Sequence, residues 1–381
     1  MLNAKKALAV IITLIYITGC LSGCSGTAGS PDGSDKLRIV TTIFPEYDWV
    51  RNVLGDRIDH ADITLLLDNG VDLHSYQPSA SDILKISTCD LFIYVGGESD
   101  KWVDDALKNA TNKNMTVINL LETLGDTVKE EEVVEGMQES EHEHDHDHDE
   151  DHDEDHDHDE DHDHDEDHDH DEDHDHDEDH DHDEDHDHDE DHDHNHHHEG
   201  GEIEYDEHVW LSLRNASSLV KAVSDALCKL DPSNAADYQK NTDAYTAKLD
   251  SLDNDYKAAT EAAPVKTLLF GDRFPFRYLV DDYGIKYYAA FVGCSAETEA
   301  SFETIKFLAD KVDELSLHSV MTIERSDQKI AETIVKSSGT KDQKILTLDS
   351  LQSVTSKDIE NGTTYLGVMQ SNLSVLKDAL R

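Results

Sequence analysis

Residues 234–262 read NAADYQKNTDAYTAKLDSLDNDYKAATEA, a stretch without Gly or Pro that ends just before Pro264. Gly and Pro are the residues that most often interrupt a helix, so their absence predicts one continuous helix of unusual length. Residues 215–230, just before it, also have a helical pattern. Since short apolar segments lie on both sides of this pair, we expect the long helix to connect two lobes.

Those apolar segments alternate with helical segments before and after the long helix. Such alternation is typical of a parallel sheet that is covered by helices on both faces. We therefore predict an α/β fold of two lobes, each a mostly parallel sheet flanked by helices, joined by one long backbone helix. The predicted strands are 36–45 (with the loop that follows), 61–67, 90–97 and 115–120 in the first lobe, and 265–270, 285–291, 319–324 and 344–349 in the second.

The N-terminus has the features of a secretory signal. Two lysines precede the apolar stretch 7–17, which is too short for a membrane span, and small residues follow it. LSGC at 21–24 has the pattern of a bacterial lipobox, in which Cys24 receives the lipid. Cys20 is the alternative, with a shorter apolar segment before it. We predict an extracytoplasmic protein that is lipid-anchored to the bacterial cell membrane.

These features give a predicted order of segments along the chain. The segments are a lipoprotein signal peptide at 1–23, a flexible tether at 24–35, an N-terminal α/β lobe at 36–230 with a disordered insert at about 130–204, the connecting helix at 231–263, and a C-terminal α/β lobe at 264–381.

The insert has an extreme composition. Residues 141–199 contain 22 of the 26 histidines and 36 of the 87 acidic residues, but no Lys, Arg or apolar side chain. The rest of the chain has 51 acidic and 31 basic residues, a net charge of −20. Nucleic acid is therefore not an expected partner, because binding to phosphates requires Lys and Arg. With nothing to bury, the repeated HDHDED unit predicts disorder.

The same repeat is rich in metal ligands. Imidazole nitrogens and carboxylate oxygens bind Zn(II), Ni(II) and Cu(II), so the repeat predicts auxiliary collection of metal ions. Two alternatives stay open: the repeat senses metal sufficiency, or it only solvates the chain. The histidines assigned to collection are His156, His158, His162, His164, His168, His170, His196, His197 and His198.

Three polar side chains lie where predicted strands end or helices begin. His74 follows the second strand, His208 directly precedes an apolar turn and a helix, and Asp349 ends the last strand of the second lobe. In doubly wound sheets, ligands bind beyond the carboxyl ends of the strands. Taken singly, each residue also has an ordinary explanation, since loop histidines are commonly exposed and an Asp after a strand commonly caps a helix.

Together and in this order, the motifs around these residues resemble those of the metal-binding solute receptors of bacterial zinc/manganese ABC importers. The motifs are HSYQPSASDI at 74–83, DEHVWLS at 206–212 and TLDSL at 347–351, and the resemblance covers roughly residues 36–381. It implies that His74, His208 and Asp349 bind a metal ion in a cleft between the lobes. It also implies that the ion is delivered to the membrane permease of an ABC importer.

The sequence departs from this family at its third ligand. Family members have HDAFGYF after the first strand of the second lobe, and its His binds the metal, or a Glu in many manganese receptors. This chain has GDRFPFRY at 271–278, which places Gly271 at the position of that His. Asp272 is the nearest predicted ligand, although alignment from Tyr283 backward places Arg273 there instead. Glu324, Glu299 and Glu297 are weaker candidates.

The sequence predicts a monomeric receptor for a divalent metal ion. Zinc is the first choice because imidazoles suit Zn(II), and manganese is the alternative because oxygen ligands favour Mn(II) or Fe(II). A manganese or iron receptor of the same type, and a surface zinc-buffer or adhesin lipoprotein, are the other functions considered. An enzyme is not expected, since neither HExxH nor GxSxG occurs. One disulfide among Cys89, Cys228 and Cys294 stays open.

Overall fold

The structure, a computed structural model, describes residues 36–138, 204–295 and 299–381. The predicted signal peptide, the two lipidation candidates Cys20 and Cys24, and the tether lie outside the described residues. The same is true of the His-rich repeat at 141–199, with all the histidines assigned to metal collection, and of Glu297.

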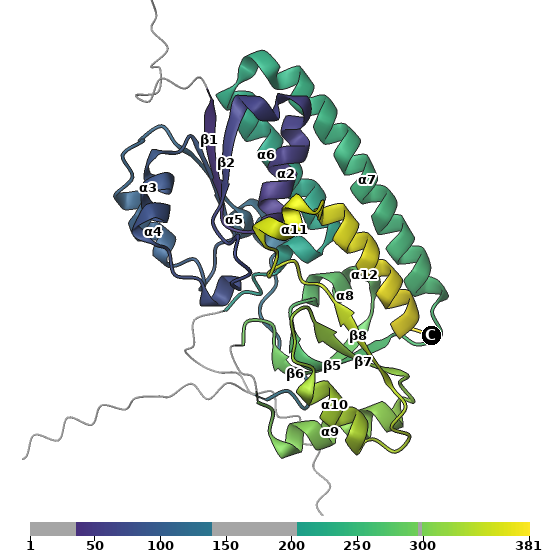
Figure 1. Ribbon diagram of the computed structural model, residues 1–381. Helices are drawn as coiled ribbons and strands as arrows, with labels where there is room; N and C mark the ends of the chain where they lie inside the picture. Colours follow the sequence, from purple (N-terminus) through teal and green to yellow (C-terminus); the bar gives the residue numbers. More distant parts are fainter. Residues whose placement is uncertain (1–35, 139–203, 296–298) are drawn as a thin grey trace, which may run out of the picture. The chain divides into compact units, whose positions relative to one another are not determined.

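The first lobe is built on a four-stranded parallel sheet (Figure 1). Its strands are β1 (Leu37–Thr41), β2 (Ala61–Leu65), β3 (Leu91–Tyr94) and β4 (Thr116–Asn119), in the spatial order β2-β1-β3-β4. Its helices are α2 (Phe44–Leu54), α3 (Ala80–Thr88), α4 (Trp102–Lys108) and α5 (Leu120–Leu124). The second and third strands lie on opposite sides of the first, and ligands of such sheets bind beyond the carboxyl ends of the strands.

The second lobe has the same strand order. Strands β5 (Thr267–Phe274), β6 (Lys286–Val292), β7 (Ser319–Ile323) and β8 (Lys344–Leu348) form a parallel sheet in the order β6-β5-β7-β8. The helices of this part are α8 (Arg277–Tyr283), α9 (Phe302–Glu314), α10 (Lys329–Ser337), α11 (Ser356–Glu360) and α12 (Tyr365–Ala379). The predicted α/β fold with two parallel sheets is confirmed.

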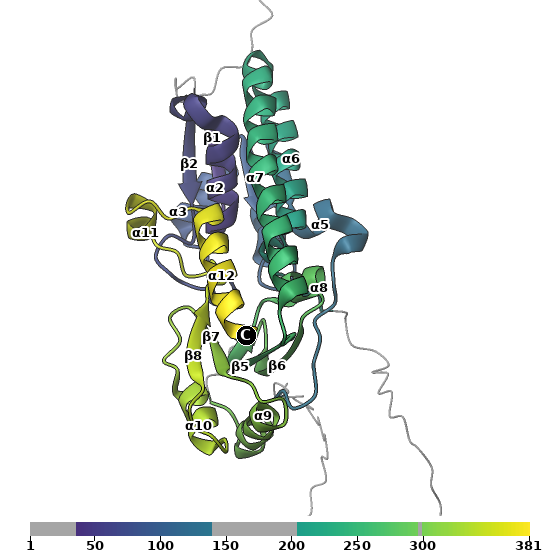
Figure 2. The same ribbon diagram turned by 90° about the vertical axis from the view of Figure 1, so that its right-hand side faces the viewer.

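Two helices connect the sheets, α6 (Leu213–Leu230) and the 28-residue α7 (Ala235–Ala262). Helix α7 contacts α2 and α6 of the first lobe as well as α8 and α12 (Figure 2). Its buried residues recur every three or four positions, which is the spacing of one helix face; they include Tyr238, Tyr245, Leu249, Leu252 and Tyr256. The predicted long helix is confirmed. No helix in the described ranges is long and apolar enough to cross a bilayer.

Helix α12 is a second link between the lobes, which the sequence did not indicate. It contacts β8 of the second sheet and α2 of the first lobe. Tyr365 at its start donates a hydrogen bond from Oη to the backbone O of Trp210 (2.6 Å). The Oη of Tyr256 donates to the backbone O of Met369 (2.6 Å). One hydrophobic core therefore includes residues of both lobes, among them Trp49 and Phe270.

Candidate metal centre

His74 lies in a short 3-10 turn, η2 (Leu73–Ser75), between β2 and α3. Asp72 begins this turn, since its Oδ1 accepts a hydrogen bond from the backbone N of His74 (3.0 Å). The ring Nδ1 of His74 lies 2.8 Å from Oγ of Ser99 and 3.4 Å from Oε2 of Glu207. Because Nδ1 faces these partners, Nε2 is the nitrogen that is left for another ligand.

His208 is fully buried and directly precedes a second 3-10 turn, η4 (Val209–Leu211). Oδ1 of Asp206 lies 2.9 Å from the backbone N of His208 and 2.9 Å from its ring Nδ1. A carboxylate at this position favours the tautomer with the proton on Nδ1 and a lone pair on Nε2. The same arrangement is common behind metal-binding histidines.

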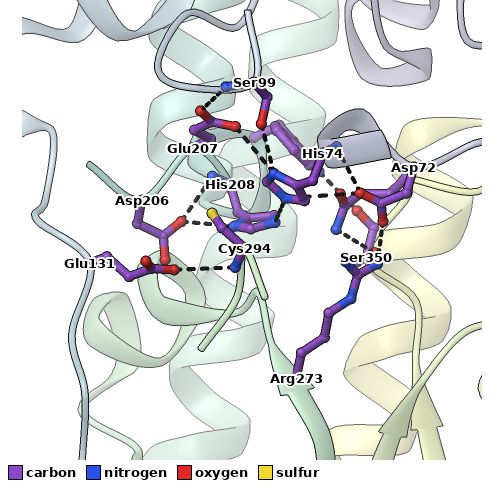
Figure 3. A network of polar contacts seen from close by, with 12 residues as sticks. Asp72, His74, Ser99, Glu131, Asp206, Glu207, His208, Arg273, Cys294 and Ser350 are labelled. Atoms are coloured by element: carbon purple, nitrogen blue, oxygen red, sulfur yellow. Dashed lines mark hydrogen bonds and ion pairs between the residues drawn. The ribbon is translucent and has the colours of Figure 1, made fainter. Parts of the chain in front are cut away.

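The two imidazoles meet at their Nε2 atoms, which lie 3.2 Å apart (Figure 3). Two nitrogens bound to one tetrahedral zinc ion at ordinary bond lengths are about 3.3 Å apart. Burial, together with the neighbouring His208, lowers the pKa of His74 to about 3, so His74 is uncharged at neutral pH. The separation and the charge state both suit the binding of one metal ion.

Buried acidic groups surround this pair. Asp206 and Glu207 are almost completely inaccessible to solvent, and burial raises the pKa of Glu207. Oε1 of Glu207 accepts a hydrogen bond from the backbone N of Ser99 (2.9 Å), whereas its Oε2 has no hydrogen-bond donor among the described residues. Carboxylates close to neutral imidazoles create a negative potential that favours a cation.

A thiol that sequence reasoning missed completes the group. Sγ of Cys294 and a ring nitrogen each of His74 and His208 all lie within 4.8 Å of one another. Cys294 follows the end of β6, and its backbone N donates to Oε1 of Glu131 (3.2 Å). The one sequence feature that could have indicated Cys294 is its position just after a predicted strand of the second lobe.

Gly293 makes this approach of Cys294 to the histidines possible. A Cβ on Gly293 would lie 3.1 Å from Cε1 of His208 and 2.9 Å from the backbone O of Phe274. Cys89, Cys228 and Cys294 are all free thiols. The disulfide that the sequence left open is therefore not formed among them.

The structure does not bring Asp272 into this group. Its carboxylate accepts hydrogen bonds from the backbone N of Arg273 (2.9 Å) and of Ile323 (3.3 Å), which ties the end of β5 to β7. Arg273, the alternative alignment partner of the family His, forms an ion pair with Asp72 of the first lobe. As a metal ligand, Asp272 stays a prediction.

Gly271 has no room for the side chain that the family carries at this position. A Cβ built there would lie 2.6 Å from Cα of Ala331, on α10, and 2.8 Å from its backbone N. Contacts this short with backbone atoms cannot be relieved by a side-chain rotation. The second lobe therefore cannot present a His at this point of β5 without moving α10.

Asp349 and Glu324 lie together in the second lobe, where they line a cavity of about 500 Å³ with Asn372. The Glu324 carboxylate accepts hydrogen bonds from the backbone N and from Oγ of Ser350 (both 2.7 Å). Burial and the nearby Asp349 raise the pKa of Glu324 to about 7. Neither belongs to the group of two imidazoles and one thiol, and Glu299 is exposed. Their roles as ligands stay predictions.

Gln352 is a further neighbour of the imidazoles that the sequence did not indicate. Its side-chain amide lies 3.2 Å from Nε2 of His208 and 3.1 Å from each carboxylate oxygen of Asp72. Gln352 comes three residues after Asp349, in the segment that follows β8. The second lobe thus places an amide and a thiol beside the two imidazoles of the first lobe.

Comparison with known proteins gives relatives with zinc-related names. The chain is 28% identical over 366 residues to the zinc-binding lipoprotein AdcA of Streptococcus pneumoniae, and this match covers 96% of the chain. The chain spans only 60% of the length of that relative. It is 27% identical over 371 residues to the high-affinity zinc uptake system protein ZnuA of Bacillus subtilis, with 97% of the chain and 96% of the relative covered.

Solved structures of similar fold include zinc-binding proteins. The Zn(II)-bound ZnuA-like domain of Streptococcus pneumoniae AdcA has a TM-score of 0.60 and 27% sequence identity to this chain. The match covers 91% of this chain and 99% of that domain. These similarities confirm the resemblance that the three motifs indicated. The family model described as ZnuA, zinc-uptake complex component A, periplasmic, matches residues 39–379, and the chain therefore belongs to this family.

Proposed function

We propose that this chain is an extracytoplasmic receptor that captures a zinc ion at His74 and His208 and delivers it to the permease of an ABC importer. The observation that carries the proposal is the separation of 3.2 Å between the Nε2 atoms of His74 and of the fully buried His208. When both rings carry their proton on Nδ1, two lone pairs face each other and no hydrogen bond can form between them. A dication between the rings is bound by both nitrogens at once.

The choice of zinc follows from the donor atoms and from the relatives. Neutral imidazoles suit Zn(II), whereas Mn(II) prefers carboxylate, carbonyl and water oxygens. Relatives along the whole chain carry zinc in their names, which supports the same ion here. Manganese is the alternative. Asp272 and Asp349 are proposed as further ligands, and each would have to give up its present hydrogen bonds to reach the imidazoles.

The cellular setting belongs to the same proposal. The periplasmic family description supports capture outside the cytoplasm, and its description as a component of a zinc-uptake complex supports a permease as partner. We infer that a lipid on Cys24 holds the receptor at the membrane, and that the chain acts as a monomer without a catalytic role. The His-rich repeat would collect ions near the tight site and raise their local concentration.

Calorimetric titration of zinc into the chain without residues 141–199 tests this function. The flanking residues belong to one compact unit, so the deletion leaves that unit complete. We expect one tight site in the deleted chain and a loss of affinity of at least about 100-fold in His74→Ala and in His208→Ala. His60→Ala, an exposed histidine at the end of η1 (Gly55–His60), is the matched control and should bind like the parent.

Two results would contradict the proposal. If the deletion itself removes tight binding, the repeat is the functional element and the chain is a zinc buffer. If the deleted chain binds zinc tightly and neither histidine variant changes the affinity, the ion is held elsewhere.

A further inference from the structure

We propose that Cys294, in place of Asp272, is the third protein ligand of the captured ion, so that the site joins two imidazoles of the first lobe to a thiolate of the second. This inference rests on the proposed function and adds to it the chemical class of the preferred ions. A thiolate favours borderline and soft ions such as Zn(II), Co(II) and Cd(II) over Mn(II). As the metal–sulfur bond forms, the proton of the thiol leaves to solvent.

The geometry needs only a small adjustment. In a tetrahedral zinc site, a thiolate sulfur and an imidazole nitrogen lie about 3.5 Å apart. The potential ligand atoms of His74, His208 and Cys294 already lie within 4.8 Å of one another. An inward movement of little more than about 1 Å, by side-chain rotation or slight closure of the lobes, brings the sulfur to bonding distance.

The second lobe has a physical reason to supply its ligand from this position. Strands β5 and β6 are neighbours in a parallel sheet, so the segments that follow them lie at the same edge. Position 271 on β5 is closed to any side chain by the backbone of Ala331. The segment after β6 carries Cys294 at this edge instead, and Gly293 gives the room that its approach to His208 requires.

A hydrogen bond to Glu131 holds this segment in place. Glu131, in the segment that follows the first sheet, accepts a hydrogen bond from the backbone N of Cys294 (3.2 Å).

The other two described cysteines have different surroundings. Sγ of Cys89 donates to the backbone O of Ile86 (3.2 Å), and Sγ of Cys228 lies 3.6 Å from the backbone O of Ala235. Neither shares a group of potential metal ligands with a histidine among the described residues.

Cobalt(II) titration of the full chain tests the proposal, because a thiolate bound to Co(II) gives a charge-transfer absorption in the near ultraviolet that imidazoles and carboxylates do not give. The His-rich repeat contains no cysteine, so cobalt bound there does not contribute to the band. We expect the band in the full chain and in Cys228→Ser, its loss in Cys294→Ser, and its disappearance when zinc displaces cobalt. Zinc affinity in Cys294→Ser should fall at least about tenfold.

The outcomes separate this inference from the proposed function. If the full chain shows no thiolate band while His74→Ala still weakens zinc binding, Cys294 is not a ligand and the receptor function stands. A band that persists in Cys294→Ser assigns the thiolate to another cysteine and overturns the inference. If the band is absent and neither histidine variant changes zinc affinity, both the inference and the proposed function fail.

Discussion

The two lobes share one strand order but differ in what they place at the carboxyl ends of their strands. The first lobe contributes His74 and His208, two imidazoles whose Nδ1 atoms lie 2.8 Å from Oγ of Ser99 and 2.9 Å from Oδ1 of Asp206. The second lobe contributes a thiol, in the segment after β6, while Asp272 at the end of β5 is bonded to backbone amides. The shared strand order therefore places the potential ligands of both lobes at the carboxyl ends of the strands. Local packing decides which side chain in each lobe can bind the metal ion.

The close contact between β5 and α10 closes one position of the second lobe to side chains. In the first lobe, the loop after β2 is free to form the turn that carries His74. In the second lobe, Gly271 lies against the backbone of Ala331, and Arg273 is directed to Asp72 across the lobes. The following predictions test this contrast, from the largest expected effect to the smallest.

Gly271→His should destabilise the second lobe and should not create a better metal site. The added Cβ would meet backbone atoms of Ala331 at 2.6 and 2.8 Å. We expect the free energy of unfolding to fall by about 3 kcal/mol or more, since overpacking of a tight core costs about 1–3 kcal/mol even where side chains can move. Urea denaturation measures the loss, and Gly271→Ala should show most of it because the clash begins at Cβ. A stable variant with tighter zinc binding would show that the position is open.

Asp206→Asn should weaken zinc binding without removing a ligand. The carboxylate holds Nδ1 of His208 and so keeps its Nε2 available for the metal. Loss of such a partner typically lowers metal affinity about 10- to 100-fold. Zinc titration should show this decrease with unchanged stoichiometry, while Asp105→Asn, on the exposed face of α4, should bind like the parent. An unchanged affinity in Asp206→Asn would mean that the ring does not depend on this carboxylate.

Glu46→Gln should reduce the pH dependence of stability. Burial, with a smaller contribution from Asp100, raises the pKa of Glu46 from 4.5 to about 8. Between these values the folded chain holds a proton that the unfolded chain has lost, so the free energy of unfolding falls as pH rises through this window. We expect Glu46→Gln to remove on the order of 1–2 kcal/mol of the difference between pH 6 and pH 8.5.

Urea denaturation at the two pH values measures this difference. Glu122→Gln, which changes an exposed glutamate on α5, is the control and should keep the slope of the parent chain. If the free energy of unfolding changes with pH by the same amount in the parent chain and in Glu46→Gln, the carboxyl group of Glu46 does not hold the proton in the folded chain.

Much of the fold could be predicted because it depends on local patterns. The stretch without Gly or Pro predicted α7, and the alternation of apolar and helical segments predicted both parallel sheets. The role of α12 could not be predicted, because its contacts arise from Tyr365 meeting Trp210 of the first lobe and Met369 meeting Tyr256 of α7, residues that are far away in sequence. Such pairings leave no periodic signal along the chain.

Some residues of the candidate site could also be predicted from the sequence, and others could not. His74 and His208 could be found because each lies in a motif at a strand end or helix start, where ligands of such sheets gather. Cys294 and Gln352 could not, because their proximity to these rings depends on how the segments after β6 and β8 meet the first lobe. The roles of Asp272 and Asp349 stay predictions, since both carboxylates are engaged by backbone amides.

Anomalous diffraction at the zinc edge, on crystals of the chain with one equivalent of zinc, tests the central claim most directly. We predict one dominant peak at about 2.0–2.1 Å from Nε2 of both His74 and His208, and about 2.3 Å from Sγ of Cys294. A dominant peak at any other place, with the two Nε2 atoms not bound to zinc, would contradict the claim that these two imidazoles form the capture site.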